Sequence, residues 1–209
     1  MKALVYTGAK ELTFQDMPDP IVSGGDNLIA IRSVGICGSD MHAYLGHDER
    51  RPAPLILGHE AAGDVIQGAM KGARVTINPL VTCTICPECK SGRENLCGKR
   101  QIISMQPRQG AFAQLVTIPS RNLVEVPKNV SFDDAALAEP LAVCWHAIRL
   151  GQQALDVDLR AANTLVIGGG AIGLGSALSL MAKGSNHIKI AEPNPKRADY
   201  LRKNTDFEI

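Results

Sequence analysis

Val166-Ile167-Gly168-Gly169-Gly170-Ala171-Ile172-Gly173 is the stretch that decides the fold of the later part of the chain. The apolar residues 164–167 predict a strand before the glycines, and residues 171–183 predict a helix after them. A second strand is expected over residues 188–191, followed by a second helix over residues 195–203. A strand, a helix and a strand in this order form the building block of a parallel sheet, so an α/β fold is predicted here.

The glycines of this turn fit the pattern G-x-G-x-x-G, with Gly168, Gly170 and Gly173 at its fixed positions and Ile172 inside it. The first glycine permits a tight turn, the second lets the backbone approach a pyrophosphate, and the third lets helix and strand pack closely. The N-terminus of the following helix offers unpaired N–H groups and a positive dipole end to the phosphates. The turn therefore predicts a dinucleotide site; the alternative is a glycine-rich structural turn without a ligand.

An acidic residue, Glu192, follows the second predicted strand, 19 residues after Gly173. Its carboxylate would accept hydrogen bonds from the adenosine ribose hydroxyls and would repel a 2′-phosphate, which favours NAD over NADP. Arg197 weakens this preference, because an arginine nearby can also contact a 2′-phosphate.

Four cysteines lie within fifteen residues in the first half of the chain, in the pattern Cys83-x2-Cys86-x2-Cys89-x7-Cys97. Four thiolates can close a tetrahedron around one ion, which is the arrangement of a structural zinc site. Proline and glycine punctuate residues 79–100, so a loop lobe without helix or strand is expected there. Disulfides or unrelated buried cysteines are the alternative interpretation.

The bulk composition is that of an ordinary globular protein of one or two domains, with 209 residues and a hydrophobic fraction of 45%. Lys and Arg total 22 and Asp and Glu total 21, so a net charge of +1 gives no basic surface to favour nucleic acid. The N-terminus becomes polar at once, and neither a secretory signal nor a membrane span is expected. Six cysteines in such a chain favour a reducing compartment, so the cytoplasm is the expected location.

The expected secondary structure changes from strands to helices after Pro127. Short strands separated by glycine and proline are expected before it, at residues 3–6, 27–34, 63–67, 74–77 and 112–118, and they predict a barrel or sandwich with loop insertions. Ser131 with Asp134 three residues later predicts a helix N-cap. A helix over residues 135–150 is then expected, interrupted near Glu139-Pro140 and ended by Gly151.

Three further short motifs complete the pattern of the chain. Cys37 lies in Gly35-Ile36-Cys37-Gly38-Ser39-Asp40-Met41-His42, His59 lies in Gly58-His59-Glu60, and Glu139 lies in Ala138-Glu139-Pro140. With the cysteine lobe, Gly110-Ala-Phe-Ala-Gln114 and the glycine turn, all in this order, the whole chain resembles the zinc-dependent alcohol and polyol dehydrogenases of the medium-chain dehydrogenase/reductase family. The resemblance implies a GroES-like, β-barrel catalytic domain over residues 1–150 and part of a Rossmann domain over residues 151–209.

The resemblance also implies two zinc ions, one catalytic and one structural, with Cys37 and His59 as ligands of the catalytic one. Alcohol dehydrogenases have a third cysteine ligand where this chain has Glu139, and glutamate there resembles the sorbitol and threonine dehydrogenase branch. In that branch the glutamate after the histidine, here Glu60, can bind zinc, and the later glutamate can hold a water at the metal. Glu60 and Glu139 both remain candidates for the third ligand.

The activity implied by the resemblance is hydride transfer between a secondary alcohol of a polyol, sugar acid or similar small molecule and NAD. Ser39 matches the hydroxyl that takes the substrate proton, and His42 matches a histidine that relays it to solvent, although a surface histidine without that role is the alternative. Cys144 matches no ligand position and is expected to pack in a core. A simple-alcohol or threonine-type dehydrogenase and a non-catalytic zinc-binding module are the rival functions.

The sequence departs from the family at two places. Residues 63–74 are shorter than the usual hairpin, and the chain stops at Ile209 after about two of the roughly six strands of a complete dinucleotide fold. We therefore expect a C-terminally truncated piece of a longer protein, whose full-length parent would be a homo-oligomer.

Overall fold

The computed structural model describes residues 1–209, which divide into two compact units, Met1–Glu139 and Pro140–Ile209. Each unit is described by itself. No helix in either unit combines the length and the apolar character needed to cross a membrane.

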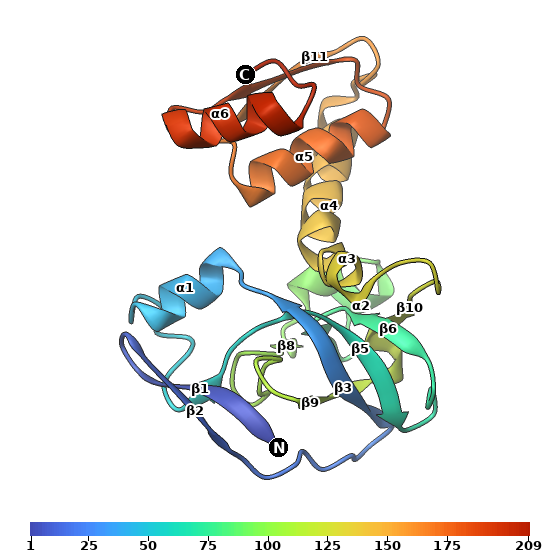
Figure 1. The fold of residues 1–209 in the computed structure, drawn as a ribbon. Coiled ribbons are helices and arrows are strands. Elements are labelled where there is room, and N and C mark those ends of the chain that lie inside the picture. Colours follow the sequence, from blue (N-terminus) through green and yellow to red (C-terminus); the bar gives the residue numbers. More distant parts are fainter. The chain divides into compact units, whose positions relative to one another are not determined.

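The first unit is built on a curved antiparallel sheet of five strands, in the order β10-β6-β5-β3-β9 (Figure 1). Its strands are β3 (Asp26–Gly35), β5 (Glu60–Gln67), β6 (Arg74–Ile77), β9 (Leu115–Pro119) and β10 (Leu123–Glu125). Side chains that alternate along these strands form the main core, in which Ile29, Val75 and Ile118 are fully buried. The expected β-type first half is confirmed, and the curled sheet has the form of a half-barrel.

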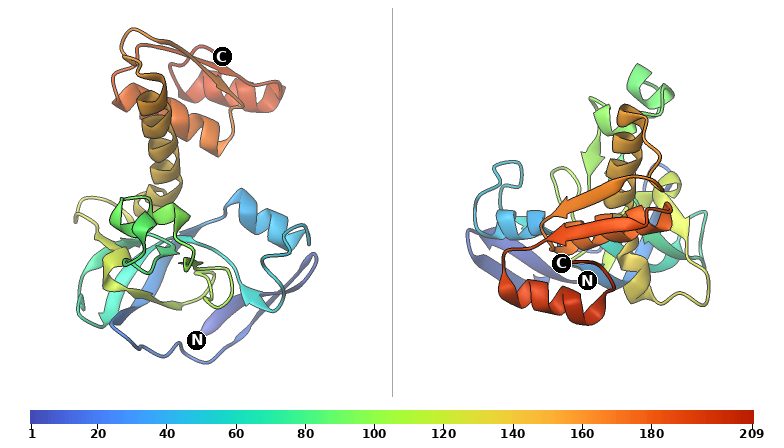
Figure 2. Two further views of the ribbon diagram at one scale, coloured as in Figure 1. Left: turned by 180° about the vertical axis from the view of Figure 1, so that it is seen from behind. Right: turned by 90° about the horizontal axis from the view of Figure 1, so that it is seen from above.

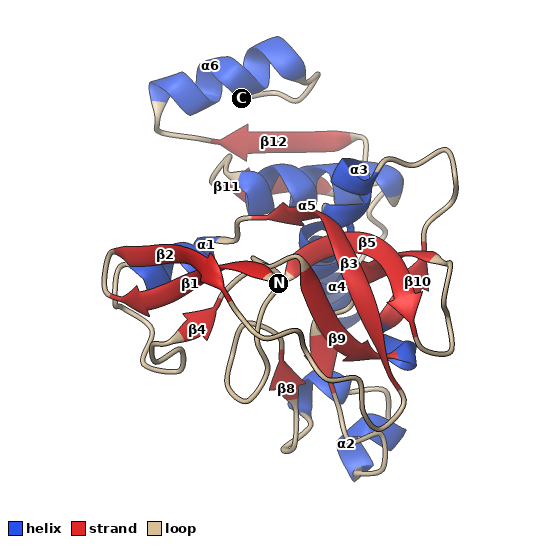
Figure 3. Ribbon diagram, turned by 60° about the horizontal axis from the view of Figure 1, so that its bottom comes forward, coloured by secondary structure: helices blue, strands red, loops and turns tan.

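A second sheet in this unit joins the N-terminal hairpin to the segment before His59 (Figure 3). Strand β1 (Lys2–Gly8) pairs with β2 (Glu11–Asp16) on one side and with β4 (Leu55–Ile56) on the other. Tyr6, Leu55 and Leu57 pack against Ala43 of helix α1 (Gly38–Tyr44). This apolar contact fixes α1, which begins directly after Cys37, against the strand that leads to His59.

The cysteine lobe contains short regular elements, which corrects the expectation of a lobe without helix or strand. Strand β7 (Leu80–Val81) pairs with β8 (Gln101–Ile102), and between them lie α2 (Pro87–Lys90) and the 3-10 turn Glu94–Leu96. Pro87 does not prevent the helical turn, because it occupies the first helical position, where its missing N–H has no intrahelical partner.

The helical segment after Pro127 begins as predicted and ends later than predicted. Ser131 caps α3 (Phe132–Ala136) by accepting a hydrogen bond from the Asp134 N–H at 3.0 Å. The break falls at Leu137, and α4 (Ala138–Leu155) then runs through Gly151, so the expectation that Gly151 ends the helix is wrong. Gly151 keeps a helical conformation, and the helix ends instead before Asp156, whose φ of +50° turns the chain.

The second unit contains the predicted strand, helix, strand and helix. Strands β11 (Asn163–Ile167) and β12 (His187–Ala191) pair in parallel and lie side by side in the right-hand view of Figure 2. Helices α5 (Ala171–Ala182) and α6 (Pro195–Asn204) bury one face of this pair, with a core that includes Leu180, Ile190 and Leu201. The chain therefore holds two strands of a Rossmann-type sheet.

The remaining short element is the 3-10 turn Ser120–Asn122, which connects β9 to β10. The Asn122 side chain donates hydrogen bonds to the carbonyls of Asn78 and Leu80, both at 2.8 Å. These bonds connect the end of the main sheet to the base of the cysteine lobe.

Candidate active site and metal centres

Cys37, His59 and Glu60 come together at one end of β3 and β5. One potential ligand atom from each lies within 4.8 Å of the others, and His59 and Glu60 are buried. The pairing of β3 with β5 places Gly35 opposite Glu60, and a side chain at Gly35 would collide with the Glu60 carboxylate. The glycine two residues before Cys37 is therefore what lets the carboxylate lie beside the thiol.

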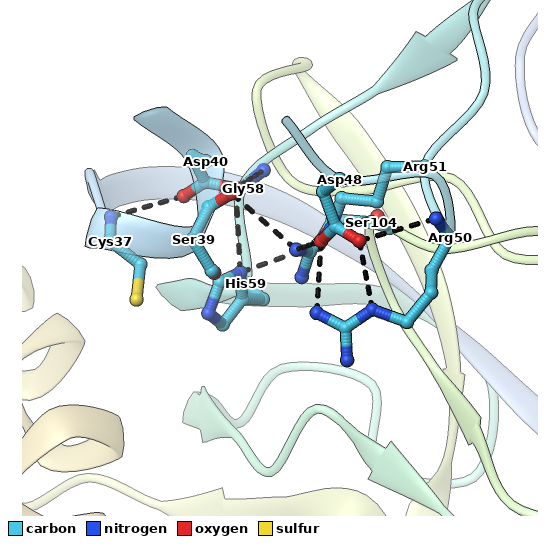
Figure 4. A network of polar contacts seen from close by, with 9 residues as sticks. All are labelled: Cys37, Ser39, Asp40, Asp48, Arg50, Arg51, Gly58, His59 and Ser104. Carbon is cyan, nitrogen blue, oxygen red and sulfur yellow. Dashed lines mark hydrogen bonds and ion pairs between the residues drawn. The ribbon is translucent and has the colours of Figure 1, made fainter. Parts of the chain in front are cut away.

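Asp40 organises the backbone around these residues (Figure 4). Its Oδ2 accepts a hydrogen bond from the Cys37 N–H at 3.0 Å, and its Oδ1 accepts one from the Gly58 N–H at 3.1 Å. Cys37 is the N-cap of α1 and Asp40 is its third helical residue, so this is a capping box. The second hydrogen bond of Asp40 also holds Gly58, the residue before His59.

The Nδ1 atom of His59 faces two polar groups. The Ser104 hydroxyl lies 3.3 Å away and Oδ1 of Asp40 lies 3.6 Å away. Histidines that bind metals use one ring nitrogen for the ion and direct the other to such partners. Nε2 is therefore the nitrogen of His59 that remains available to an ion.

The donor chemistry of the group fits a divalent cation. A hydrogen bond from His59 lowers the pKa of the Cys37 thiol. Burial opposes the charged form of His59, but hydrogen bonds with Asp40 and Cys37 outweigh it and raise the pKa of His59 to about 10. A cation bound here would replace this hydrogen bond and release protons, because metal ligation needs a thiolate and a neutral imidazole.

Glu139 lies near this group but is not among the three residues whose ligand atoms meet. Burial raises the pKa of its carboxyl, and the charges of Glu60 and Asp40 raise it further, against the opposing effect of His59. Of the two glutamates that the sequence left open, the structure brings Glu60 into the cluster and leaves Glu139 beside it.

Ser39 and His42 lie on α1, after Cys37. The Ser39 hydroxyl is buried and has no hydrogen-bond partner, whereas His42 is exposed. A buried hydroxyl without a partner costs free energy unless a ligand satisfies it. The orphaned Ser39 hydroxyl is therefore an independent sign that the group accommodates a polar ligand.

The four lobe cysteines also converge, with all four sulfur atoms within 4.8 Å of one another. The sulfur atoms of Cys86 and Cys89 are 3.4 Å apart, those of Cys83 and Cys97 are 3.6 Å apart, and those of Cys83 and Cys89 are 4.0 Å apart. Tetrahedral zinc with bonds of about 2.3 Å needs sulfur atoms about 3.8 Å apart. None of these cysteines forms a disulfide, so the set fits a closed four-thiolate site.

Backbone groups of the lobe stabilise the thiolate form of Cys83. Hydrogen bonds from the backbone N–H groups of Ile85 and Cys86 lower the pKa of the Cys83 thiol to about 6. In the same cluster, the N–H of Cys89 lowers the pKa of the Cys86 thiol, but burial and hydrogen bonds with Cys89, Glu88 and Cys83 outweigh it and raise that pKa to about 12. Zinc binds thiolates, so binding an ion in the lobe would release protons.

The glycine turn has the geometry that its pattern predicts. Gly168 has a φ of +95°, which glycine adopts freely, and a side chain at Gly173 would collide with the Gly168 carbonyl oxygen. A Cβ at Gly170 would meet nothing within 4 Å, so the space in front of the α5 N-terminus is open. Ile172 lies on the first turn of α5 and is 52% exposed, which leaves it accessible beside that space.

Glu192 is more tightly held than the sequence suggests. Its carboxylate accepts hydrogen bonds from the N–H groups of Gly169 and Asn194, each at 2.8 Å, and from Arg197 at 3.0 Å. These donors, with Asn194 and Gly169 first, lower the pKa of Glu192. The side chain is only 1% exposed, whereas that of Arg197 is 52% exposed.

Comparison with known families identifies the chain. Residues 23–128 match the alcohol dehydrogenase GroES-like domain family, which is more than half of the 209 residues. The chain belongs to the zinc-dependent medium-chain dehydrogenase/reductase family. Within this family it is 34% identical over 207 residues to L-galactonate-5-dehydrogenase of Escherichia coli K12, covering 96% of this chain and 58% of that protein.

Two further members of the family have a similar sequence identity to this chain. L-threonine 3-dehydrogenase of Alteromonas mediterranea is 34% identical over 97% of this chain and 60% of its own length. Sorbitol dehydrogenase of Bacillus subtilis is 33% identical over 97% of this chain and 59% of its own length. The chain thus spans somewhat less than two thirds of the length of the curated relatives it matches.

Solved structures of family members share the fold over the whole chain. A zinc-binding dehydrogenase from Sinorhizobium meliloti 1021, bound to NADP, has a TM-score of 0.86 and 27% identity and covers 100% of this chain, which covers 61% of it. An alcohol dehydrogenase from E. coli CFT073, complexed with NADH, has a TM-score of 0.89 and 26% identity, with 100% and 62% coverage. The predicted fold class is confirmed by these matches.

Sequence reasoning missed three polar residues that support His59. Asp40 could have been recognised, because an acidic residue three positions after an N-cap is typical of a capping box. Ser104 and Arg51, which also appear in Figure 4, had no such signal, since both lie in loops outside the motifs and Ser104 is 45 residues from His59 and 53 from Arg51.

Proposed function

We propose that the protein is a zinc- and NAD-dependent oxidoreductase that transfers a hydride between a secondary alcohol and the nicotinamide. The single observation that supports this most is the convergence of Cys37, His59 and Glu60 beside the orphaned hydroxyl of Ser39. Three protein ligands are what a catalytic zinc site uses, because the fourth position must stay open. Residues 1–150 would supply the metal-dependent chemistry, and residues 151–209 would bind the cofactor.

In this proposal Cys37, His59 and Glu60 hold the catalytic zinc, and the half-buried carboxyl group of Glu139 lies next to it. When bound, zinc supplies a Lewis acid that lowers the pKa of a substrate hydroxyl and polarises a carbonyl in the reverse direction. Burial raises the pKa of the Glu139 carboxyl, and this carboxyl would hold a neutral ligand such as water next to the metal by hydrogen bonding.

The proton released from the substrate needs a path to solvent. The Ser39 hydroxyl is buried and unpartnered, so it is free to accept that proton through a hydrogen bond. His42 lies one turn along α1 and is exposed, so it can pass the proton to water. Both residues lie on α1, the helix that Cys37 caps.

The cofactor would bind at the glycine turn. Backbone N–H groups at the start of α5 would hold the pyrophosphate, and Gly170 would leave space for it. Glu192 would accept the ribose hydroxyls, which favours NAD, and the exposed Arg197 leaves some affinity for NADP. The two family structures described above contain NADP and NADH, respectively.

The substrate class is supported by the relatives and by Glu139, which replaces the cysteine ligand of alcohol dehydrogenases. L-galactonate-5-dehydrogenase and sorbitol dehydrogenase point to a sugar acid or polyol. L-threonine 3-dehydrogenase supports an amino alcohol as the second candidate. None of the six cysteines forms a disulfide and five lie in the two proposed zinc sites, so we propose a reducing compartment, the cytoplasm, as the place of the reaction.

The experiment that tests the proposal counts zinc by atomic emission and titrates NAD on the same purified chain. We expect two zinc ions per chain and saturable NAD binding. Cys37→Ala should lose one zinc ion, whereas Cys144→Ala, a buried cysteine outside both clusters, should keep two. One zinc ion that leaves only on unfolding, with no NAD binding, would contradict the proposal and favour a zinc-binding module.

A further inference from the structure

A buried ion pair lies behind the catalytic cluster, in the loop before β4. The side chains of Arg51 and Asp48 are 5% and 7% exposed, and Nη1 of Arg51 lies 2.7 Å from Oδ2 of Asp48. Removing two charges from water costs several kcal/mol per ion, so such a pair contributes little net stability unless it makes further hydrogen bonds. The role of this pair must therefore be sought in the other contacts of Arg51.

The Arg51 guanidinium connects two segments that carry site residues (Figure 4). Its Nε donates a hydrogen bond to the Ser104 carbonyl at 2.9 Å, and its Nη1 lies 3.4 Å from the Ser39 carbonyl. Ser104 is 53 residues away along the chain and Ser39 is 12 residues away. The planar fork of arginine suits this arrangement, because it holds several donors in a fixed geometry.

Ser104 has an unusual conformation that the Arg51 bond holds in place. It is fully buried and has a φ of +68°, a left-handed conformation that costs a non-glycine residue free energy. Such a conformation persists only where its surroundings determine it. In this conformation the Ser104 hydroxyl lies 3.3 Å from Nδ1 of His59.

We propose that Arg51 is a positioning residue of the catalytic metal centre, which orients His59 through Ser104 and the Ser39 segment through its carbonyl. The inference rests on the proposed function, since it assumes that His59 is a metal ligand. Partners of a ligating histidine fix the ring, and their loss typically lowers metal affinity about 10- to 100-fold. Arg51 contacts Ser104 and not His59 itself, so its removal is expected to lower metal affinity about tenfold, at the lower end of this range.

The alternative is that Arg51 only joins two loops and stabilises the fold. Arg50 provides a matched control, because it binds the same Asp48 carboxylate at 2.8 Å and 3.0 Å. Its side chain is 72% exposed and has neither of the carbonyl contacts of Arg51. Arg50→Met therefore removes one partner of Asp48 without touching Ser104 or Ser39.

The experiment measures Co²⁺ binding at the Cys37 site, with the four-cysteine lobe kept filled by zinc. Absorption from the thiolate–cobalt bond reports both the affinity and the geometry of that site alone. Arg51→Met should weaken Co²⁺ binding about tenfold and shift the absorption band, whereas Arg50→Met should match the wild type. Equal Co²⁺ affinity and spectra for Arg51→Met and Arg50→Met would overturn the inference.

Two further variants keep the test decisive if Arg51→Met does not fold. Ser104→Gly removes the hydroxyl at a position whose φ glycine adopts freely, so it should keep the melting temperature while weakening Co²⁺ binding. Arg51→Lys keeps the charge but not the fork, and in the Ser104→Gly background it should cause a smaller loss than it causes alone, because the route through Ser104 is already removed. Unchanged Co²⁺ affinity in Ser104→Gly, or losses that simply add, would also overturn the inference.

The wild-type titration separates this inference from the proposed function. A wild-type chain with no cobalt absorption after lobe saturation would contradict the catalytic metal site itself. A wild-type chain that binds Co²⁺, with Arg51 and Ser104 variants that bind it equally well, would contradict only the positioning role.

Discussion

Glu192→Gln separates two roles that the structure allows for this carboxylate. Glu192 can read the ribose of the cofactor, or it can serve only to hold the glycine turn through its bonds to Gly169 and Asn194. Glutamine has the same shape and can still accept one of these N–H groups. The change therefore removes the negative charge and keeps one of the two loop contacts.

The expected magnitude follows from the kind of hydrogen bond that is lost. Bonds to a charged acceptor are worth about 1.5–3 kcal/mol, against about 0.5–1.5 kcal/mol for neutral ones. A difference of about 1.4 kcal/mol corresponds to a tenfold change in Kd. We expect NAD to bind about tenfold more weakly, while NADP binds equally well or better because the repulsion of its 2′-phosphate is removed.

Calorimetric titration of both cofactors against the wild type and Glu192→Gln checks this prediction. Arg197→Gln is the matched control, since it removes the exposed partner of Glu192 and should weaken NADP rather than NAD. An equal loss for NAD and NADP in Glu192→Gln would refute the reasoning, because it would mean that the carboxylate supports the turn and does not discriminate between cofactors.

Three other substitutions test separate parts of the account. Cys89→Ser should lower the melting temperature of the first unit and release the lobe zinc, since structural zinc contributes to folding free energy; an unshifted melting curve would count against that role. Cys37→Ala should abolish metal-dependent turnover in the full-length protein while leaving the circular dichroism spectrum unchanged, and turnover at the wild-type rate would exclude a catalytic zinc there. Gly173→Ala should weaken NAD at least tenfold, because its Cβ collides with the Gly168 carbonyl and displaces the turn; a Kd within twofold of the wild type would show that the turn does not bind the cofactor.

The glycine turn could be predicted from sequence because its constraints are local. Gly168 needs a positive φ and Gly173 needs close packing, and both requirements depend on residues only a few positions away. The strand, helix and strand around it were predictable for the same reason. The end of α4 was not, because Gly151 remains helical in open surroundings and Asp156 turns the chain instead.

The support of the catalytic cluster depends on tertiary contacts that no motif encodes. Ser104 lies 45 residues from His59 along the chain and Arg51 lies 53 residues from Ser104. No local sequence pattern can indicate contacts over such separations. The choice between Glu60 and Glu139 depends on the same packing, in which the pairing of Gly35 with Glu60 brings that carboxylate to Cys37. The sequence offered both glutamates as candidates, and strand register places Glu60, rather than Glu139, in the cluster with Cys37 and His59.

The central claim is that the chain holds two chemically different zinc sites, and X-ray absorption at the zinc edge of the purified chain tests it most directly. Four thiolates in the lobe and a single thiolate at the Cys37 cluster predict an average of between two and three sulfur ligands per zinc, with nitrogen or oxygen as the remainder. Cys37→Ala should raise this average to about four as the mixed site empties. An average of four sulfur ligands in the wild type, with one zinc ion per chain, would contradict the claim.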